Sequence, residues 1–145
     1  FSPLKLVQLD SQTKITEKTP KMLIKYAKDK TTYITSDGSE IYEALNPKND
    51  PVDIPYSIAI ARVEPFASTK EHFLLHTEIY YILKGRGKIT VGDDSSEVVE
   101  GDTILIPPRK NQFIENKTSD PLEFMAIVSP PWRKEIDFLA IQGGT

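Results

Sequence analysis

The sequence predicts an all-β fold, a sandwich or barrel of antiparallel strands. From residue 56 onward, short runs rich in β-branched and aromatic residues recur at roughly ten-residue spacing. Turn-forming Gly, Asp, Asn and Pro residues separate these runs, and only one segment, after Pro130-Pro131, is a candidate helix. Short strands with regular turns are typical of an antiparallel sandwich or barrel.

The N-terminal part of the chain is predicted to be an arm. Residues 1–36 are mixed and lysine-rich, and we expect them to pack on the barrel or on a partner subunit. The barrel domain is predicted over residues 37–145. It begins at Asp37-Gly38, a hairpin turn signal between the β-rich runs 31–35 and 40–42.

The remaining elements follow in chain order. Each predicted strand ends at a turn signal such as Gly85-Arg86-Gly87 or Pro107-Pro108. A short C-terminal helix is expected over residues 132–141. The predicted strands are 56–63, 78–84, 88–91, 97–100, 103–106, 112–116 and 122–128.

The run 79–83, Ile-Tyr-Tyr-Ile-Leu, has no polar alternation, so both faces of its strand need to be covered. The arm or a second subunit can supply the cover. We expect a homodimer.

Composition excludes several classes of protein. The 145 residues, 39% hydrophobic and 27% charged, suit one globular domain and argue against disorder. A net charge of −3 argues against nucleic acid or an anionic membrane as partner, and no apolar run is long enough to span a bilayer. The sequence has no cysteine, so a metal would need nitrogen and oxygen ligands. No signal-peptide pattern is seen, and we expect a cytoplasmic protein.

Both histidines, His72 and His76, lie in one short window that ends at Glu78. Residues two apart on a strand share a face and lie about 6.6 Å apart, so His76 and Glu78 are expected to point into the barrel together. Such a pair can hold a metal or transfer protons, and Glu78 and His76 are the candidate catalytic residues. His72 lies roughly 13 Å from His76 along an extended chain and joins them only if the backbone turns a corner.

Two sequence motifs resemble those of the cupin superfamily. Glu78, followed after six residues by Gly85, resembles the end of the first cupin signature. The run 101–107, Gly-Asp-Thr-Ile-Leu-Ile-Pro, resembles the start of the second, and Asn116 falls at its closing Asn. The resemblance covers residues 37–138 and implies a small stand-alone cupin, a jelly-roll β-barrel of antiparallel strands.

The chain departs from the cupin pattern at the metal positions. His72 and Glu78 match the first histidine and the glutamate, whereas Leu74 and Gln112 replace the other two histidines. The resemblance also implies that the backbone turns sharply between His72 and His76, where one strand ends and the next begins. The ligand set it suggests is therefore His72, His76, Glu78 and Gln112, for a divalent transition metal such as Fe, Mn, Ni or Zn.

An amide binds metal more weakly than an imidazole, and Leu74 leaves an apolar gap, so reduced affinity is expected. The alternative is a barrel without metal, in which His76 is hydrogen-bonded to Glu78 or to a neighbour.

The same alignment suggests residues around the pocket. Tyr80 and Ile82 share the face of Glu78, Phe66 and Arg109 replace motif glycines, and core packing or solvent exposure is the alternative role for each. The expected pocket-lining residues are Leu74, Tyr80, Ile82, Phe66, Arg109, Phe113 and Trp132.

Three functions follow from this reading. The first is a small-molecule enzyme with its site inside the barrel, with or without a metal ion, performing decarboxylase, dioxygenase, isomerase or lyase chemistry on a polar metabolite. The second is a non-catalytic module that binds a small ligand. The third is a metal-free epimerase or cyclase that uses a His–Glu pair.

Overall fold

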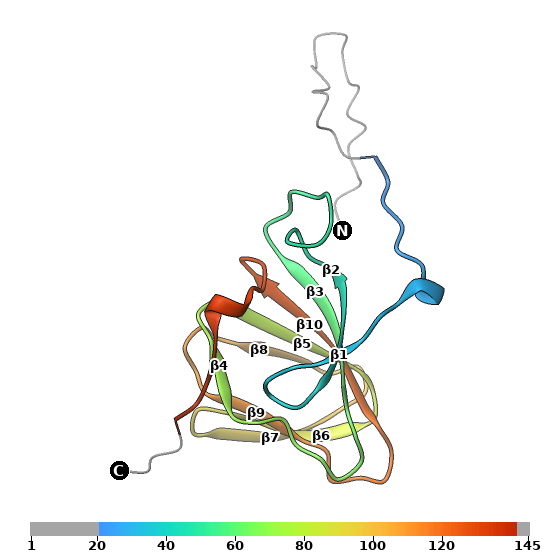
Figure 1. The fold of residues 1–145 in the computed structure, drawn as a ribbon. Coiled ribbons are helices and arrows are strands. Elements are labelled where there is room, and N and C mark those ends of the chain that lie inside the picture. Colours follow the sequence, from blue (N-terminus) through green and yellow to red (C-terminus); the bar gives the residue numbers. More distant parts are fainter. Residues whose placement is uncertain (1–20, 142–145) are drawn as a thin grey trace, which may run out of the picture.

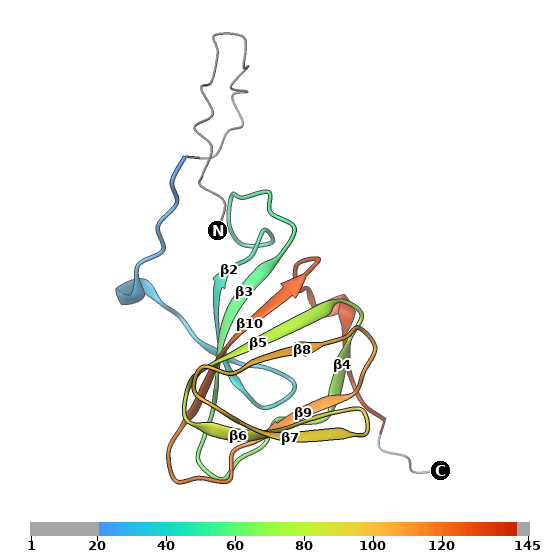
Figure 2. The same cartoon turned by 180° about the vertical axis from the view of Figure 1, so that it is seen from behind.

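The computed structural model describes residues 21–141, which form a barrel of two antiparallel β-sheets (Figure 1). The predicted all-β jelly-roll fold is confirmed. Figure 2 shows β6, β7 and β9 lying across the barrel from β5 and β8. In the described range the larger sheet has six strands, in the spatial order β1 (Tyr33–Ile34), β2 (Glu40–Leu45), β3 (Ser57–Val63), β10 (Leu122–Ser129), β5 (Thr77–Lys84) and β8 (Thr103–Ile106). The other has five, in the order β11 (Asp137–Leu139), β4 (His72–Leu74), β9 (Gln112–Glu115), β6 (Arg86–Val91) and β7 (Asp94–Val99).

The core lies between the sheets and is built by the alternation of each strand. Along β10, every second residue from Leu122 to Val128 is buried, and β5 buries Glu78, Tyr80 and Ile82 in the same way. Ile82, Ile114 and Leu122 are completely shielded from solvent. Burial of each such side chain contributes about 1.5–3 kcal/mol, so this apolar cluster holds the two sheets together.

The outer face of the six-stranded sheet is also partly apolar. Tyr81 is 42% exposed and Leu105 is 65% exposed. The described part of the arm leaves this face open, because residues 21–34 are themselves exposed and only β1 joins the sheet, by pairing with β2. The boundary expected at residue 37 thus falls inside the β1–β2 hairpin. The homodimer stays a prediction.

The prediction of a helix over residues 132–141 is wrong. A single 3₁₀ turn, Lys134–Ile136, is followed by strand β11, which pairs with β4. Ile136 is buried against Leu74 and Val128. This packing and the free edge of β4 stabilise an extended segment that local helix propensity could not reveal.

None of the helical segments in residues 21–141 has the length and apolar character needed to cross a membrane.

Phe66 and Arg109 adopt left-handed backbone conformations, with φ of 58° and 68°. Both occupy positions where the cupin motifs have glycine. Phe66 follows Pro65 in a turn closed by the Ala67 amide, which donates to the Glu64 carbonyl at 3.1 Å. Proline followed by a residue of positive φ is the pattern of a type II turn, in which glycine is favoured. Phe66 therefore holds a backbone conformation that glycine would adopt without strain.

Substituting Phe66→Gly is expected to raise the free energy of unfolding by about 0.5–1 kcal/mol, because glycine relieves the left-handed strain. Little packing is lost, since Phe66 is 74% exposed. Phe66→Ala is the control, as it removes the ring but keeps the strain. Urea denaturation of both variants checks this, and a stabilisation shared by Phe66→Ala would contradict the backbone explanation.

Candidate functional site

A cavity of about 70 Å³ lies between the inner face of the six-stranded sheet and strands β4 and β11. The lining residues from β3 and β10 include small ones, which leave space there, beside the larger Ile58, Phe124 and Val128. The small ones are Ser57, Ala59, Ala61 and Ala126. Its volume is well below the roughly 300–1,000 Å³ of sites for drug-sized ligands. The cavity therefore suits a small ligand.

Glu78 is the central polar residue of the cavity. Strand β5 turns its side chain inward, and it is 6% exposed. The Gln112 amide Nε2, on β9, donates a hydrogen bond to Glu78 Oε1 at 2.9 Å, and the Tyr80 hydroxyl donates to Gln112 Oε1 at 2.9 Å. Tyr80 thereby fixes which end of the amide faces Glu78, and the chain Tyr80–Gln112–Glu78 orients the carboxyl group.

Burial raises the pKa of Glu78 to about 7. The hydrogen bond from Gln112 and the nearby His72 lower this pKa, while the negative charges of Asp137 and Asp37 raise it. Burial also raises the pKa of Tyr80 well above its usual range, so its hydroxyl stays protonated and remains a donor. At neutral pH both forms of the Glu78 carboxyl are therefore populated, as a general acid–base requires.

His72, on β4, faces the same cavity and is 4% exposed. Its Nδ1 lies 2.9 Å from the Lys70 carbonyl oxygen. A carbonyl can only accept, so Nδ1 carries a proton and Nε2 is directed elsewhere. Nε2 lies 3.8 Å from Asp37 Oδ2, which is too far for a hydrogen bond. His72 thus presents a nitrogen without a hydrogen-bond partner to the cavity.

Two further carboxylates, Asp37 and Asp137, line the cavity and were not predicted. Asp37 lies in the β1–β2 turn, where its Oδ1 accepts hydrogen bonds from the Ser39 amide at 3.0 Å, the Ser39 hydroxyl at 2.6 Å and the Thr35 hydroxyl. The Lys70 amide donates to the Asp37 carbonyl at 2.7 Å and holds this turn against the approach to β4. The only signal in the sequence was Asp37-Gly38, which indicates a turn and nothing about a site.

Asp137 opens β11, opposite Leu74 of β4. The Trp132 indole Nε1 donates to Asp137 Oδ2 at 3.1 Å. Burial raises the pKa of Asp137, and the nearby His72 opposes that rise. Asp137 was not predicted to line the cavity, because a helix was expected over residues 132–141 and a helix would not have placed Asp137 beside β4.

The expectation that His76 points into the barrel is wrong. His76 lies in the bend between β4 and β5, before Thr77 begins the strand, so the alternation that buries Glu78 does not extend to it. Its Nδ1 is 2.8 Å from the Pro130 carbonyl oxygen, and the residue is not part of the cavity lining. His76 therefore bonds to a neighbour, which was the alternative expectation.

The predicted metal ligands do not fit a metal ion. His72 and Glu78 face the cavity, but His76 does not, and both polar atoms of Gln112 are used in bonds to Tyr80 and Glu78. Within residues 21–141, no three Asp, Glu or His side chains are grouped so that they could hold a metal ion. This donor set therefore does not suit a metal ion in the reaction.

Three of the seven expected pocket-lining residues line the cavity: Leu74, Tyr80 and Trp132. The other four expectations are wrong. Ile82 lies in the apolar core, which was its alternative role. Phe113 alternates with buried Gln112 and Ile114 and so faces outward, while the two residues with left-handed backbones lie in exposed turns: Phe66 and Arg109.

Comparison with known proteins shows the family to which the chain belongs. A sequence profile described as "Cupin domain" matches residues 59–128. The chain belongs to the cupin superfamily. It is 42% identical over 104 residues to the uncharacterized protein MJ1618 of Methanocaldococcus jannaschii, a match that covers 71% of this chain and 82% of that protein.

Solved cupin structures share the fold. The polyketide cyclase RemF from Streptomyces resistomycificus has a TM-score of 0.71 at 16% identity, over 85% of this chain and 88% of that chain. The oxalate decarboxylase of Lactobacillus farciminis, in a formate complex, has a TM-score of 0.67 at 21% identity, over 77% of this chain. This cupin spans only 34% of that longer chain. Likeness at this level of identity shows the fold alone.

The raised pKa of Glu78 predicts a pH-dependent stability that depends on this residue. The folded protein binds the Glu78 proton more tightly than the unfolded chain does, so the associated stability is present below about pH 4.5 and is lost as the pH rises to about 7. Glu78→Gln stays neutral and avoids this loss. At about pH 8 the variant is expected to be more stable than the wild type by on the order of 3 kcal/mol, and at acidic pH the difference should vanish.

Urea denaturation across this pH range measures the effect. Glu97→Gln, at an exposed position of β7, is the control and should show no pH-dependent difference. A Glu78→Gln difference that is constant with pH would contradict the shifted titration of Glu78.

Proposed function

We propose that this cupin is a small-molecule enzyme that transfers protons within its barrel cavity, with Glu78 as general acid–base and His72 as its partner. The observation that carries the proposal is the buried Glu78 carboxyl, held by Gln112 at 2.9 Å in the cavity that His72 also lines. A carboxyl group whose pKa lies near neutrality, in a cavity and oriented by a fixed donor, is typical of a catalytic acid–base.

Each surrounding residue has a role in this proposal. The ionised Glu78 carboxylate takes a proton from a C–H, N–H or O–H group of the ligand, and the protonated carboxyl returns a proton at another position. Gln112 and Tyr80 are positioning residues, because they act on the ligand only through Glu78. His72 can accept or donate a second proton at Nε2, which lies 3.8 Å from Asp37 Oδ2.

The reaction classes that suit such a pair are isomerisation, epimerisation and cyclisation of a small polar metabolite. The fold does not choose among them, since solved cupins of the same fold include a cyclase and a decarboxylase. The metal-dependent alternative is disfavoured by the donor set, in which Leu74 and a fully bonded Gln112 occupy two of the four metal positions.

Deuterium exchange tests the proposed activity. The protein is incubated in D₂O with a set of small carbonyl and amino metabolites, and deuterium incorporation is followed by mass spectrometry. Exchange catalysed by the wild type should fall by roughly 10²–10⁴-fold in Glu78→Gln, because general acid–base catalysis contributes about that factor. His72→Gln should also lower the rate.

His76→Gln is the matched control, because this histidine bonds to the Pro130 carbonyl outside the cavity lining. It should exchange at the wild-type rate. Exchange that survives in Glu78→Gln, or that is lost equally in His76→Gln, would contradict the proposal. Ligand binding without any exchange would instead indicate the non-catalytic binding module.

A further inference from the structure

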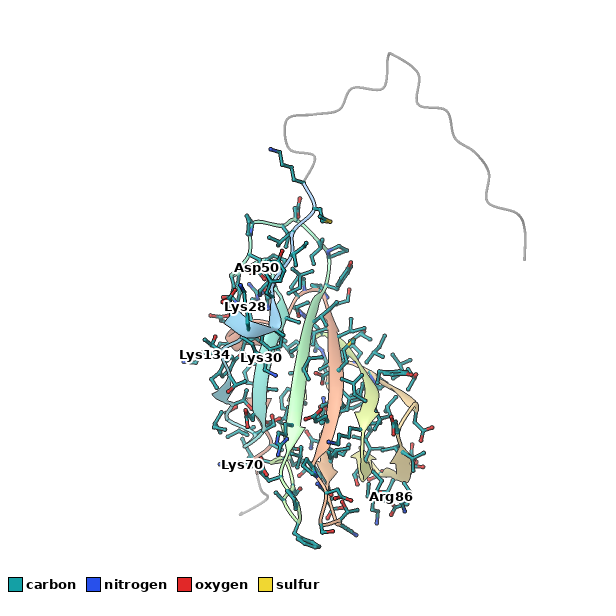
Figure 3. The ribbon with its side chains drawn as sticks, turned by 90° about the vertical axis from the view of Figure 1, so that its right-hand side faces the viewer. Lys28, Lys30, Asp50, Lys70, Arg86 and Lys134 are labelled. Carbon is teal, nitrogen blue, oxygen red and sulfur yellow. The ribbon has the colours of Figure 1, made fainter. Side chains whose placement is uncertain are left out.

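The charges that line the cavity are almost all negative. Asp37, Glu43, Glu78 and Asp137 belong to the lining, and no Lys or Arg in residues 21–141 does. Glu43 is partly neutralised by Lys48, whose Nζ lies 2.8 Å from its carboxylate. Basic side chains instead lie at the periphery of the molecule, as Figure 3 shows for those it labels: Lys28, Lys30, Lys70, Arg86 and Lys134.

The polar atoms left free in the cavity are hydrogen-bond acceptors. Among the described residues, no hydrogen bond is made to Glu78 Oε2, Asp37 Oδ2 or Asp137 Oδ1. His72 Nε2 also makes none, although His72 is only 4% exposed, and as long as the ring is neutral this nitrogen is an acceptor too. These atoms are not sealed off, because no fully buried side-chain nitrogen or oxygen in residues 21–141 lacks a hydrogen-bond partner. They are therefore accessible from the cavity, where a bound ligand can donate hydrogen bonds to them.

The donors of the cavity are largely used within the protein. The Thr35 and Ser39 hydroxyls both donate to Asp37 Oδ1, and the Tyr80 hydroxyl donates to Gln112. A ligand that fits this surface must therefore bring N–H or O–H donors and does not need acceptors. An anionic ligand would meet carboxylates of its own sign.

Aromatic rings complete the lining. Tyr80 packs against Phe124 with ring centroids 4.2 Å apart, and Trp132 and Tyr33 also line the cavity. Faces of aromatic rings attract cations electrostatically. The Trp132 ring already carries one such cation, because Lys48 Nζ lies 4.4 Å from its centroid. Carboxylate oxygens and aromatic rings in one lining are a favourable environment for a further nitrogen cation.

We propose that the ligand of this cavity is a small organic cation that carries an ammonium, amidinium or guanidinium group. Its N–H groups would bind the free oxygens of Asp37, Glu78 and Asp137. The volume of about 70 Å³ restricts the ligand to a few non-hydrogen atoms around the cationic group. A divalent metal is the less suitable cation, because the described carboxylates and His72 are not grouped to coordinate one.

Acetamidinium, acetamide and acetate provide the test, because they share one shape and differ in charge. Each is titrated into ¹⁵N-labelled protein at neutral pH while the backbone amide signals of His72 and Glu78 are followed. Acetamidinium is expected to shift these signals with a Kd in roughly the millimolar range, as suits a ligand of its size. It should bind at least about tenfold more tightly than acetamide, because hydrogen bonds to charged groups are the stronger ones. Acetate should not bind.

Substitutions of single carboxylates test which residues bind the cation. Asp137→Asn keeps an oxygen that can accept from Trp132, and it is expected to weaken acetamidinium binding by about tenfold. Asp37→Asn is a second, independent variant with the same expected effect, so the test does not depend on the folding of one protein. Glu97→Gln removes an exposed charge on β7 and should leave the affinity unchanged.

Because this proposal rests on the function proposed above, the outcomes are chosen to separate the two. If acetate or acetamide shifts the His72 and Glu78 signals more strongly than acetamidinium does, the ligand is not a cation. The cavity would still be a ligand-binding site, as the proposed function requires. Signals unchanged by all three compounds would overturn the cation proposal, whereas the acid–base function is decided separately by the deuterium-exchange assay. Equal weakening in Glu97→Gln would show that only general charge attraction acts, and would also overturn the proposal.

Discussion

Burial of the Glu78 carboxyl group is the constraint on which the rest of the site depends. A carboxylate inside a β-barrel loses its hydration, and this loss is unfavourable unless the group is protonated or receives strong hydrogen bonds. Here a single amide donor, Gln112, bonds one oxygen at 2.9 Å, which is too little to hold the pKa at its ordinary value. The fold therefore keeps a carboxyl group that changes protonation state near neutral pH.

The surrounding fold makes this burial possible and useful. Small residues on β3 and β10 leave a cavity beside Glu78, and the β1–β2 turn and β11 each bring a further carboxylate to it, Asp37 and Asp137. Burial is the main cause of the raised pKa values of Glu78 and Asp137, and the negative charge of Asp37 raises both further. A ligand that supplies positive charge and N–H donors would offset this repulsion and bind the free carboxylate oxygens. The proposed acid–base function and the proposed cation recognition thus depend on one arrangement.

The fold and the position of the site could be predicted from the sequence because both depend on local patterns. The alternation along β5 places Glu78 and Tyr80 inside, and the spacing from Glu78 to Gly85 and from Gly101 to Pro107 identifies the family. The composition of the site could not be predicted in this way. Asp37 reaches the cavity only because a hairpin folds across the barrel opening, and Asp137 because β11 pairs with β4, both of which are contacts between distant segments. The prediction that His76 points inward was wrong for a local reason. Strand β5, whose alternation would have turned this side chain inward, begins one residue later, at Thr77.

A direct titration of the Glu78 side-chain carboxyl by ¹³C NMR is the sharpest test of this account. The carboxyl signal is expected to shift with a midpoint of about pH 7, because burial outweighs the Gln112 hydrogen bond. In Gln112→Leu, which removes the donor and retains the burial, the midpoint should rise further. A midpoint near 4.5, the ordinary value for glutamate, would show that the carboxyl is hydrated and ionised and would contradict the account.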